Sequence, residues 1–529
     1  MESIPVGIDV GTRHSILAII DDHIGPRVIK NRWGNEKTSS FVGYRHGRLC
    51  AAEDALPAVF TYPGGSCVSV KRHIGASQKL RLGGRTFVAE ELLQVLLLYL
   101  REDAEAYLQA VVRECFIAVP SCFDFKQRDM VKSAAQKAGF RGVKLINEPT
   151  AAAMAVSLEG NVLVFDFGAG AVDISAVEKK SDLCHVLESI GSTKFGGMDL
   201  DKEIALHIWK LMGERGDPSE DPRWPLLLME AEAIKESLSF TNVVNWWPRA
   251  CGFILHRNKP LAIYREEIES LIAPLILPVL DLAKRTWDRY NCQILLLAGG
   301  SARMPLVRRL LAEAIAEPEK VQICPDEAIA VGAAVLAGKR GKLFIDVLSC
   351  DLAISTTDGG ISVIASKGTP LPIKLAKRFM VVGSGSVEAK VLQLKSDESG
   401  SRVETLSTLV IKGTRSGDVV KVIFLVDGSG LLRIDVANEK GNLYLSQDVE
   451  IPNFPSRDYY FKERKHKIEE LERKLALFSY LFDPPLEKKI TELFNSVRCL
   501  QSAEEDLWQD ALAVLESTVN RIAQVVKNK

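Results

Sequence analysis

The clearest pattern in the chain is a short apolar run, a glycine turn and a second apolar run. Val162–Phe165 and Val172–Ile174 are β-prone and apolar, and Gly168 and Gly170 stand between them. Two such runs around a glycine turn predict a β-hairpin. Glycine opens backbone angles closed to other residues and leaves bare N–H groups, which can cradle phosphate oxygens. Taken alone, the pattern fits an ordinary hairpin equally well.

The pattern of two apolar runs around a glycine turn occurs again elsewhere in the chain. Ser3–Ile20 is again a strand, an Asp-x-Gly turn and a strand, with Asp9 and Gly11 in the turn. A third glycine turn, Gly299–Arg303, follows the apolar run Gln293–Ala298. Two Asp-bearing hairpins and a late Gly-Gly turn predict one nucleotide held between two related lobes. That arrangement is typical of actin-like ATPases and sugar kinases.

Asp166 and Asp173 flank the central turn, one on each predicted strand. Two carboxylates beside a phosphate would repel it unless a divalent cation lies between them. A hard cation such as Mg²⁺, which holds waters and phosphate oxygens, resolves that conflict.

Helical spacing of apolar residues alternates with strands up to about residue 340, and composition shifts at Lys339–Lys342. From Leu343 to about Pro452, strand-like alternation with Gly-rich turns predicts an all-β domain, and after Pro455 the pattern is helical. The main helices predicted in the first part are Ala89–Gln109, Phe125–Ala138, Trp224–Phe240 and Arg265–Tyr290. One further hairpin is predicted over Ala250–Ile263.

Composition narrows the class of protein. The 529 residues are too many for one core, so several domains are expected. The net charge of −1 gives no general reason to bind nucleic acid or a membrane surface. The ten cysteines are scattered without metal-ligand spacing, which predicts reduced thiols. No apolar run is long enough for a membrane span, and no secretory signal begins the chain, so a cytoplasmic location is expected.

Two residues are candidates for chemistry on a phosphate. Lys71, read as standing at a strand end, could neutralise charge that develops as a bond breaks, although a Lys-Arg pair is usually a solvated surface. Glu148 precedes Pro149 at a predicted helix start. A carboxylate there either complements the helix dipole or orients and deprotonates the attacking water.

Taken in order, these segments resemble the seventy-kilodalton heat-shock chaperones of the DnaK type over nearly the whole chain. The most specific motifs are Gly7–Thr12, Ile146–Ala153, Asp166–Asp173, Gly299–Pro305 and Cys324–Ala328. The resemblance implies a multidomain α/β plus β protein. It would consist of a two-lobed actin-like ATPase domain (1–340), a linker (341–347), a β-sandwich peptide-binding domain (348–455) and a short helical lid (456–529).

The resemblance also implies roles for single residues. Asp9, Asp166 and Asp173 would surround Mg²⁺ and the phosphates, mostly through water. Lys71 and Glu148 look like the catalytic pair, the first stabilising charge and the second handling the water. The residues that would hold ATP or ADP are Gly11, Thr12, Arg13, Gly168, Gly170, Gly196, Gly197, Glu232, Lys235, Ser239, Gly299, Gly300, Ser301, Arg303 and Asp326.

Two further sets follow from the same resemblance. Pro120 and Arg128 match positions that relay the nucleotide state to the linker, whose counterpart here includes Asp346. The residues that would line a groove for extended apolar peptides are Ile354, Val387 and Ala389.

The chain departs from the family pattern at several positions. Ala171 replaces a threonine whose hydroxyl touches the terminal phosphate and the water, and losing one such contact can cost on the order of a hundredfold in rate. Arg13 replaces a second threonine and could reach the phosphates or point to solvent, and His14 stands where asparagine is usual. The stretch between Ile74 and Phe87 is short, which bears on nucleotide-exchange partners.

The expected function is an ATP-hydrolysing chaperone, slow in its chemistry, that binds and releases unfolded apolar peptide segments. A J-domain co-chaperone and a nucleotide-exchange factor are candidate partners. The alternative is a nucleotide-sensing interaction protein with little ATPase activity, which Ala171 and Arg13 favour. A metabolite kinase is disfavoured by the linker and the β domain.

Overall fold

The computed structural model describes residues 4–448, except 22, 62–65, 68, 77, 181–182, 222, 252–258, 322, 339–342, 357–359, 383–384, 398–399 and 439–442. The predicted lid, 456–529, lies outside the described residues. One compact unit comprises Met1–Gln78 and Val88–Ile451, and Lys79–Phe87 belongs to a second unit. Within the described residues, no helix combines the length and the apolar character needed to cross a membrane.

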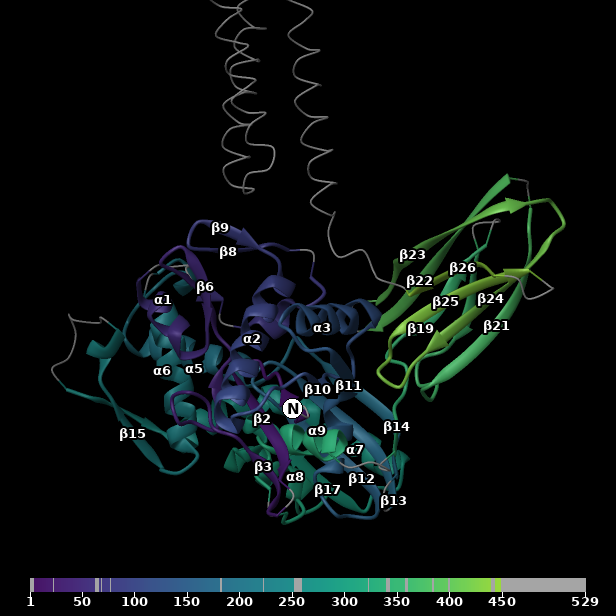
Figure 1. Cartoon of the computed structure of the whole chain (residues 1–529). Helices are drawn as coiled ribbons and strands as arrows, with labels where there is room; N and C mark the ends of the chain where they lie inside the picture. Colours follow the sequence, from purple (N-terminus) through teal and green to yellow (C-terminus); the bar gives the residue numbers. More distant parts are fainter. Residues whose placement is uncertain are drawn as a thin grey trace, which may run out of the picture. The chain divides into compact units, whose positions relative to one another are not determined.

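The first sheet carries the first Asp-x-Gly hairpin (Figure 1). β1 pairs in parallel with β10 and antiparallel with β2, which makes the hairpin predicted from the sequence. Helix α9 (Ala328–Gly338) packs so closely that a β-carbon on Gly7 would collide with its backbone. The strand order is β11 (Gly142–Asn147), β10 (Glu114–Val119), β1 (Val6–Asp9), β2 (His14–Asp21) and β3 (Gly25–Val28), with β4 (Thr38–Ser39) on β2.

The second sheet carries the second hairpin and is buried on both faces. On β12, Leu163 and Phe165 belong to one hydrophobic core, and Val162 and Val164 to another. Successive strand residues point to opposite faces, so a strand covered on both sides reads as a continuous apolar run. The order is β17 (Ile294–Ala298), β12 (Gly160–Phe167), β13 (Val172–Lys180), β14 (Leu183–Ser192) and β18 (Leu343–Ile345).

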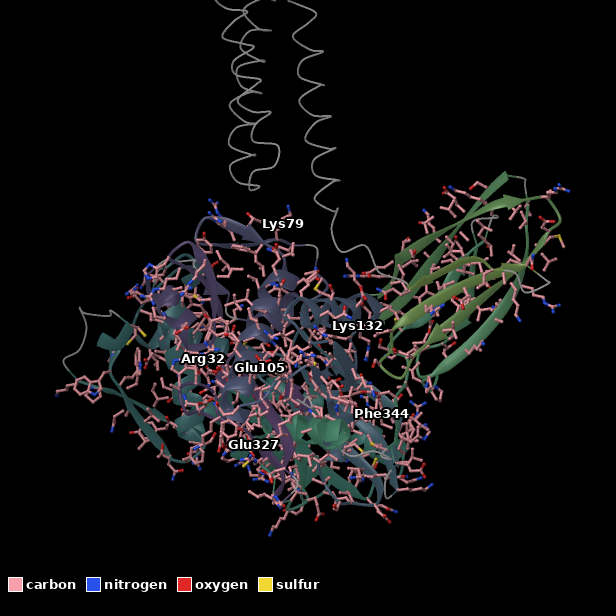
Figure 2. All side chains as sticks on the ribbon, in the orientation of Figure 1. Arg32, Lys79, Glu105, Lys132, Glu327 and Phe344 are labelled. Carbon is pink, nitrogen blue, oxygen red and sulfur yellow. The ribbon has the colours of Figure 1, made fainter. Side chains whose placement is uncertain are left out.

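Strand β18 is the apolar linker segment, and it adds to the second sheet in parallel with β14. Phe344 is half-buried on this strand and packs against the core beneath it (Figure 2). An apolar segment at a domain boundary is therefore accounted for, because it pairs with an edge strand.

The predicted helices form close to their expected bounds, and Gly139 follows α3 at a φ of 101°, as a helix C-terminus favours. The described helices are α1 (Leu56–Thr61), α2 (Ala89–Leu108), α3 (Phe125–Lys137), α4 (Glu148–Met154), α5 (Gly197–Leu211), α6 (Trp224–Leu238), α7 (Arg265–Arg289), α8 (Pro305–Ala314) and the helix α9 given above.

The hairpin predicted over Ala250–Ile263 is wrong. Residues Pro248–Cys251 form a 3₁₀ turn, and β16 (Leu261–Tyr264) pairs instead with β15 (Val243–Trp246). A proline cannot donate to a ladder, so the chain leaves the strand at Pro248. The other small sheets are β5 (Val42–Arg45) with β6 (Arg48–Ala51) and β7 (Ser66–Cys67), and β8 (Leu80–Leu82) with β9 (Arg85–Phe87).

The all-β region consists of two four-stranded sheets around one hydrophobic core, to which Leu352, Leu409, Phe424 and Ile434 contribute. β24 and β25 form an antiparallel hairpin around Asp427–Gly430, within the region predicted to be all-β. The sheets are β20 (Ile361–Ala365), β19 (Asp351–Ser355), β22 (Gly385–Asp397) and β23 (Gly400–Thr414), and β21 (Ile373–Met380), β24 (Val419–Val426), β25 (Leu432–Asn438) and β26 (Leu443–Asp448).

Candidate functional site

A cleft of about 440 Å³ is lined by elements of both large sheets. Of the residues predicted to bind nucleotide or act on it, all but Asp173, Gly196 and Gly197 line this cleft. Residues lining it that the sequence analysis did not single out are Ile16, Lys37, Ala169, Glu236, Phe240, Met304 and Ile329. The sequence patterns therefore select residues that lie together around one cleft, although they are scattered from Asp9 to Asp326 along the chain.

The glycine turns interlock at the floor of the cleft. A β-carbon on Gly170 would collide with the Thr12 side chain from the other hairpin, and one on Gly197 would collide with Ser301. Ser301 Oγ also donates to the Gly168 carbonyl at 3.1 Å. Glycine is required here for close approach, so the turns that could cradle phosphate also join the two halves of the site.

Lys71 and Glu148 form a buried ion pair, with Nζ and Oε1 2.5 Å apart. Lys71 lies in a 3₁₀ turn, Val70–His73, and not at a strand end as predicted. Glu148 is the first residue of α4, as the Asn-Glu-Pro pattern predicts. Burial alone would lower the pKa of Lys71, but the carboxylates of Glu148 and Asp9 outweigh it and raise this pKa. The lysine is therefore a fixed positive charge in the site.

The three aspartates carry an excess of negative charge for one lysine. Burial, followed by neighbouring charges that include Glu148, raises the pKa of Asp9 and of Asp173 to about 7, and it raises the pKa of Asp166 as well. Asp166 and Asp173 are direct partners across the β12–β13 hairpin. Asp173 Oδ2 is buried without a hydrogen-bond partner among the described residues. An added cation would offset the excess negative charge and give the buried Asp173 oxygen a partner.

The way such a cation would be held follows from the same residues. Among the described residues, no group of three or more His, Cys, Asp or Glu side chains converges closely enough to ligate a metal directly. The donors are all carboxylates, which suit a hard cation that keeps several waters. The residues present therefore fit Mg²⁺ held mainly through water, which is how the sequence resemblance implied it.

Arg13 does not point to solvent, which was one of the two alternatives expected from the sequence, but lines the cleft. Its guanidinium forms an ion pair with Glu232 on α6 and lies over the ring of Phe41, 4.6 Å from the centroid. The two paired side chains are only 13% and 15% exposed. Arg13 comes from the first sheet, and α6 packs in the core of the second. The pair therefore spans the cleft.

Other polar contacts join the remaining residues predicted to hold ATP or ADP. Lys235 contacts Asp201 at 2.7 Å and donates to the Gly197 carbonyl at 3.1 Å, and Ser239 Oγ donates to the Lys235 carbonyl at 3.3 Å. Asp326 pairs with Arg303 at 3.3 Å and with Lys37. These two cations hold the pKa of Asp326 below its usual value against the opposing effect of burial.

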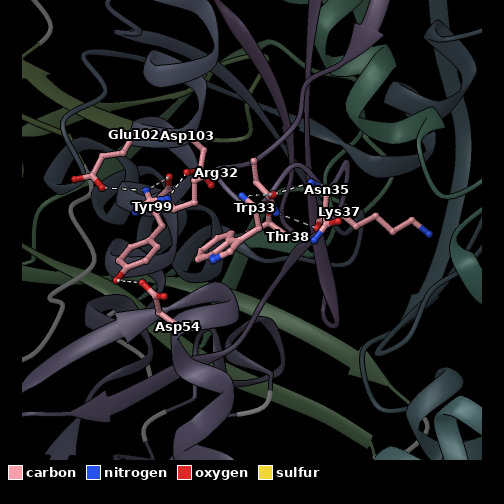
Figure 3. A network of polar contacts seen from close by, with 10 residues as sticks. Arg32, Trp33, Asn35, Lys37, Thr38, Asp54, Tyr99, Glu102 and Asp103 are labelled. Atoms are coloured by element: carbon pink, nitrogen blue, oxygen red, sulfur yellow. Dashed lines mark hydrogen bonds and ion pairs between the residues drawn. The ribbon is translucent and has the colours of Figure 1, made fainter.

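Lys37 reaches Asp326 from a loop that is held on α2. Arg32 donates from Nε to Asp103 Oδ1 at 2.5 Å and from Nη2 to Glu102 Oε2 at 3.2 Å (Figure 3). Asn31 closes the loop by accepting from the Asn35 N–H at 2.9 Å. No local sequence signal identifies Lys37, because its partner is almost three hundred residues away in the chain.

Two of the residues predicted to relay nucleotide state, Arg128 and Asp346, share one buried network through Asn147. Asp346, just after the linker strand, accepts from Asn147 Nδ2 at 2.6 Å and from Thr150 Oγ1 at 3.2 Å. Arg128 donates to Asn147 Oδ1 and, at 3.2 Å, to the Ser429 carbonyl of the β domain. Burial raises the pKa of Asp346, with Arg128 acting against it. Asn147 immediately precedes Glu148, so the linker contacts the neighbour of the catalytic candidate.

Pro120 directly follows β10, and its carbonyl accepts from the Phe123 N–H at 3.0 Å. The peptide-groove residues lie in the β domain. Ile354 is a core residue, 2% exposed, while Val387 and Ala389 on β22 are half-buried against that core. Their role in a groove stays a prediction.

A family model described as Hsp70 protein matches residues 5–81 and 76–474. The chain belongs to the Hsp70 family. Its similarity to the chaperone protein DnaK of Metamycoplasma hominis is 30% identity over 484 residues, which covers 85% of this chain and 80% of that protein. DnaK of Mycoplasmopsis synoviae (strain 53) is 28% identical over 464 residues, covering 83% and 77%.

Membership of the Hsp70 family agrees with the architecture. The mixed α/β region with two large sheets and the separate β region fit an actin-like ATPase domain followed by a β domain. The family recognised from sequence motifs is thus confirmed. Arg13, Ala171 and His14 remain the features in which this Hsp70 chain differs from the pattern expected at the phosphate turns.

Proposed function

We propose that this Hsp70 chain is an ATP-dependent chaperone that binds and releases unfolded apolar peptide segments. The observation that supports it best is the contact chain from Asp346 through Asn147 to Glu148, which joins a docked linker to a cleft holding Lys71. Such a connection serves a protein in which nucleotide controls a second domain. Both relatives named above are chaperones, which does not favour the nucleotide-sensing alternative.

The catalytic roles follow from the charges. Glu148 orients the attacking water and accepts its proton, because it is the buried carboxylate at the start of α4. Lys71 Nζ, fixed beside it, stabilises the negative charge that develops on the terminal phosphate. The amides of the turns at Gly11, Gly168 and Gly299 hold phosphate oxygens. When bound through water to Asp9, Asp166 and Asp173, Mg²⁺ would neutralise phosphate charge.

The domain arrangement is part of the proposal. Residues 1–340 form the ATPase domain, 341–347 the linker, 348–455 the peptide-binding β domain with Ile354, Val387 and Ala389 near its groove, and 456–529 the lid. ATP favours the docked linker and fast peptide exchange, and hydrolysis frees the linker. A J-domain protein would act on hydrolysis and an exchange factor on nucleotide release.

Single-turnover hydrolysis of ATP by the full chain, with and without an apolar peptide, tests this proposal. We expect slow hydrolysis that the peptide accelerates. Glu148→Gln is the matched control, because it keeps the size of the side chain but removes the base, and it should bind ATP without hydrolysing it. Hydrolysis at the same rate in both proteins would contradict the assigned chemistry, and an absent peptide effect would contradict the chaperone assignment.

A further inference from the structure

Ser121 contacts the candidate catalytic centre but has no assigned role. It follows Pro120 at the end of β10 and is 5% exposed. Its Oγ donates to Asp173 Oδ1 at 2.5 Å. Among the described residues, the other carboxylate oxygen of Asp173 has no hydrogen-bond partner. The Ser121 hydroxyl is thus the side-chain donor that sets the orientation of this carboxylate.

Three of the next four residues, Phe123, Asp124 and Phe125, contact the β domain. The Phe123 carbonyl accepts from Ser349 Oγ at 2.8 Å. Asp124 forms an ion pair with Lys395, although its own side chain is only 3% exposed. The ring of Phe125 belongs to the hydrophobic core of the β domain. One short segment, 121–125, therefore contacts Asp173 at its first residue and the β domain at its last three.

This segment is stiff enough to transmit a displacement. The Phe123 N–H closes a turn onto the Pro120 carbonyl at 3.0 Å. Asp124 caps α3, accepting from the Gln127 N–H at 2.9 Å, while Gln127 Oε1 accepts from the Asp124 N–H at 3.1 Å. If the β domain leaves, Asp124 keeps its cap but loses its cation, and the ring of Phe125 loses the apolar core against which it packs. The segment therefore has a reason to move when docking changes.

We propose that Ser121 is a positioning residue that couples docking of the β domain to the orientation of Asp173. With the β domain docked, segment 121–125 is held at both ends and Ser121 fixes the carboxylate. When the domain undocks, the segment relaxes, the hydroxyl withdraws and Asp173 can rotate. The inference rests on the proposed function and adds a residue that the family motifs do not mark.

Three variants of the full chain test this role. Ser121→Ala removes the donor, and Ser121→Thr keeps a hydroxyl at the same position. Ser175→Ala is the matched control, because Ser175 is a fully buried serine on β13 whose hydroxyl contacts Ser189 at 2.6 Å and not a carboxylate. The measurements are the single-turnover rate, ATP affinity by calorimetry, and hydrogen exchange of segments 121–125 and 348–350 without nucleotide.

We expect Ser121→Ala to lower the single-turnover rate by about tenfold to a hundredfold, the usual cost of losing a group that orients a ligand. ATP affinity should stay close to that of the parent. Hydrogen exchange should rise in both segments, and Ser121→Thr should restore the rate and the protection. Loss of rate together with loss of ATP affinity, or no recovery in Ser121→Thr, would reduce Ser121 to a structural role and overturn the inference.

The exchange measurement separates this inference from the proposed function. If the parent neither binds nor hydrolyses ATP, the chaperone proposal fails, but exchange without nucleotide still reports whether Ser121 connects the two segments. Exchange that rises in Ser121→Ala and not in Ser175→Ala supports the connection. Equal exchange in Ser121→Ala and Ser175→Ala, whatever the ATPase result, refutes it.

Discussion

Removing the positive charge of Arg13 is expected to accelerate nucleotide release. Arg13 and Glu232 form an ion pair across the cleft, with side chains 13% and 15% exposed. A nucleotide leaves only when the elements on the two sides separate, and that separation breaks the pair. Arg13→Gln removes the charge and leaves a shorter polar side chain that can no longer reach Glu232 as an ion pair. Arg285→Gln is the control, because Arg285 pairs with Asp281 on the exposed surface of one helix.

The size of the effect follows from which contacts break. The Arg13–Phe41 contact does not count, because Phe41 follows β4, which pairs with β2 on the same side of the cleft as Arg13. Two unit charges about 4 Å apart attract by about 4 kcal/mol at an effective dielectric constant near 20. Desolvation offsets much of this attraction. A net loss of about 1.4 kcal/mol corresponds to roughly tenfold faster release.

The assay is displacement of a fluorescent ADP analogue by excess ATP in a stopped-flow instrument. Arg13→Gln should release the analogue about tenfold faster than the parent, which corresponds to about 1.4 kcal/mol, and Arg285→Gln should match the parent. Glu232→Gln and the double variant complete a cycle. If the pair is the cause, the two changes are not additive. Unchanged release in Arg13→Gln, or strictly additive effects, would refute the role of the pair.

Three further predictions follow from the same site. Ala171→Thr should raise the single-turnover rate with ATP affinity nearly unchanged, because it supplies a donor used mainly in the transition state, and a rate no faster than the parent, alone or with Arg13→Thr, would count against this account. Asp346→Asn should weaken the ATP-dependent protection of the linker from protease, since Asp346 accepts from Asn147 and Thr150. Equal cleavage with and without ATP in the parent would argue against coupling. Burial raises the pKa of Asp9 from 3.8 to about 7. The folded protein without nucleotide therefore holds this proton more tightly than the unfolded chain does, and it loses stability as pH rises from 3.8 through 7. Asp9→Asn should therefore raise the melting temperature at about pH 8 and lose this advantage toward about pH 4. A gain of the same size at both pH values would contradict the assignment.

The strands, helices and glycine turns that build the cleft could be predicted from the sequence because each has a local cause. Gly168 and Gly170 mark a turn between apolar runs, and Pro149 marks the first turn of α4. The errors also have local causes. The strand pairing with β16 was assigned to the wrong neighbour, because Val243–Trp246 is short and partly exposed and gives only a weak pattern. Lys71 was placed at a strand end because four residues cannot distinguish a strand from a 3₁₀ turn.

Side-chain partners could not be predicted in this way. Arg13 stood where a phosphate contact or solvent exposure was expected, and its partner Glu232 lies on a helix of the other half of the site. Lys37 and Ser121 could not be predicted as parts of the site. Neither belongs to a motif, and the partner of each lies far along the chain. Contacts of this kind depend on how the sheets and helices pack, which periodicity does not specify.

The positions of these distant contacts favour control at the first turn of α4. Asn147 binds Asp346 of the linker, and the next residue, Glu148, binds Lys71 in the cleft. Arg128 joins the same Asn147 to the β domain through Ser429. A one-residue separation on a buried helix start allows little independent motion, since every residue of α4 is buried. We therefore expect a shift of the predicted linker to displace Glu148 relative to Lys71, and a change in the charge of the cleft to act on Asn147. Under the proposed function, coupling would require no long pathway, because the linker and the candidate catalytic carboxylate are held by adjacent residues.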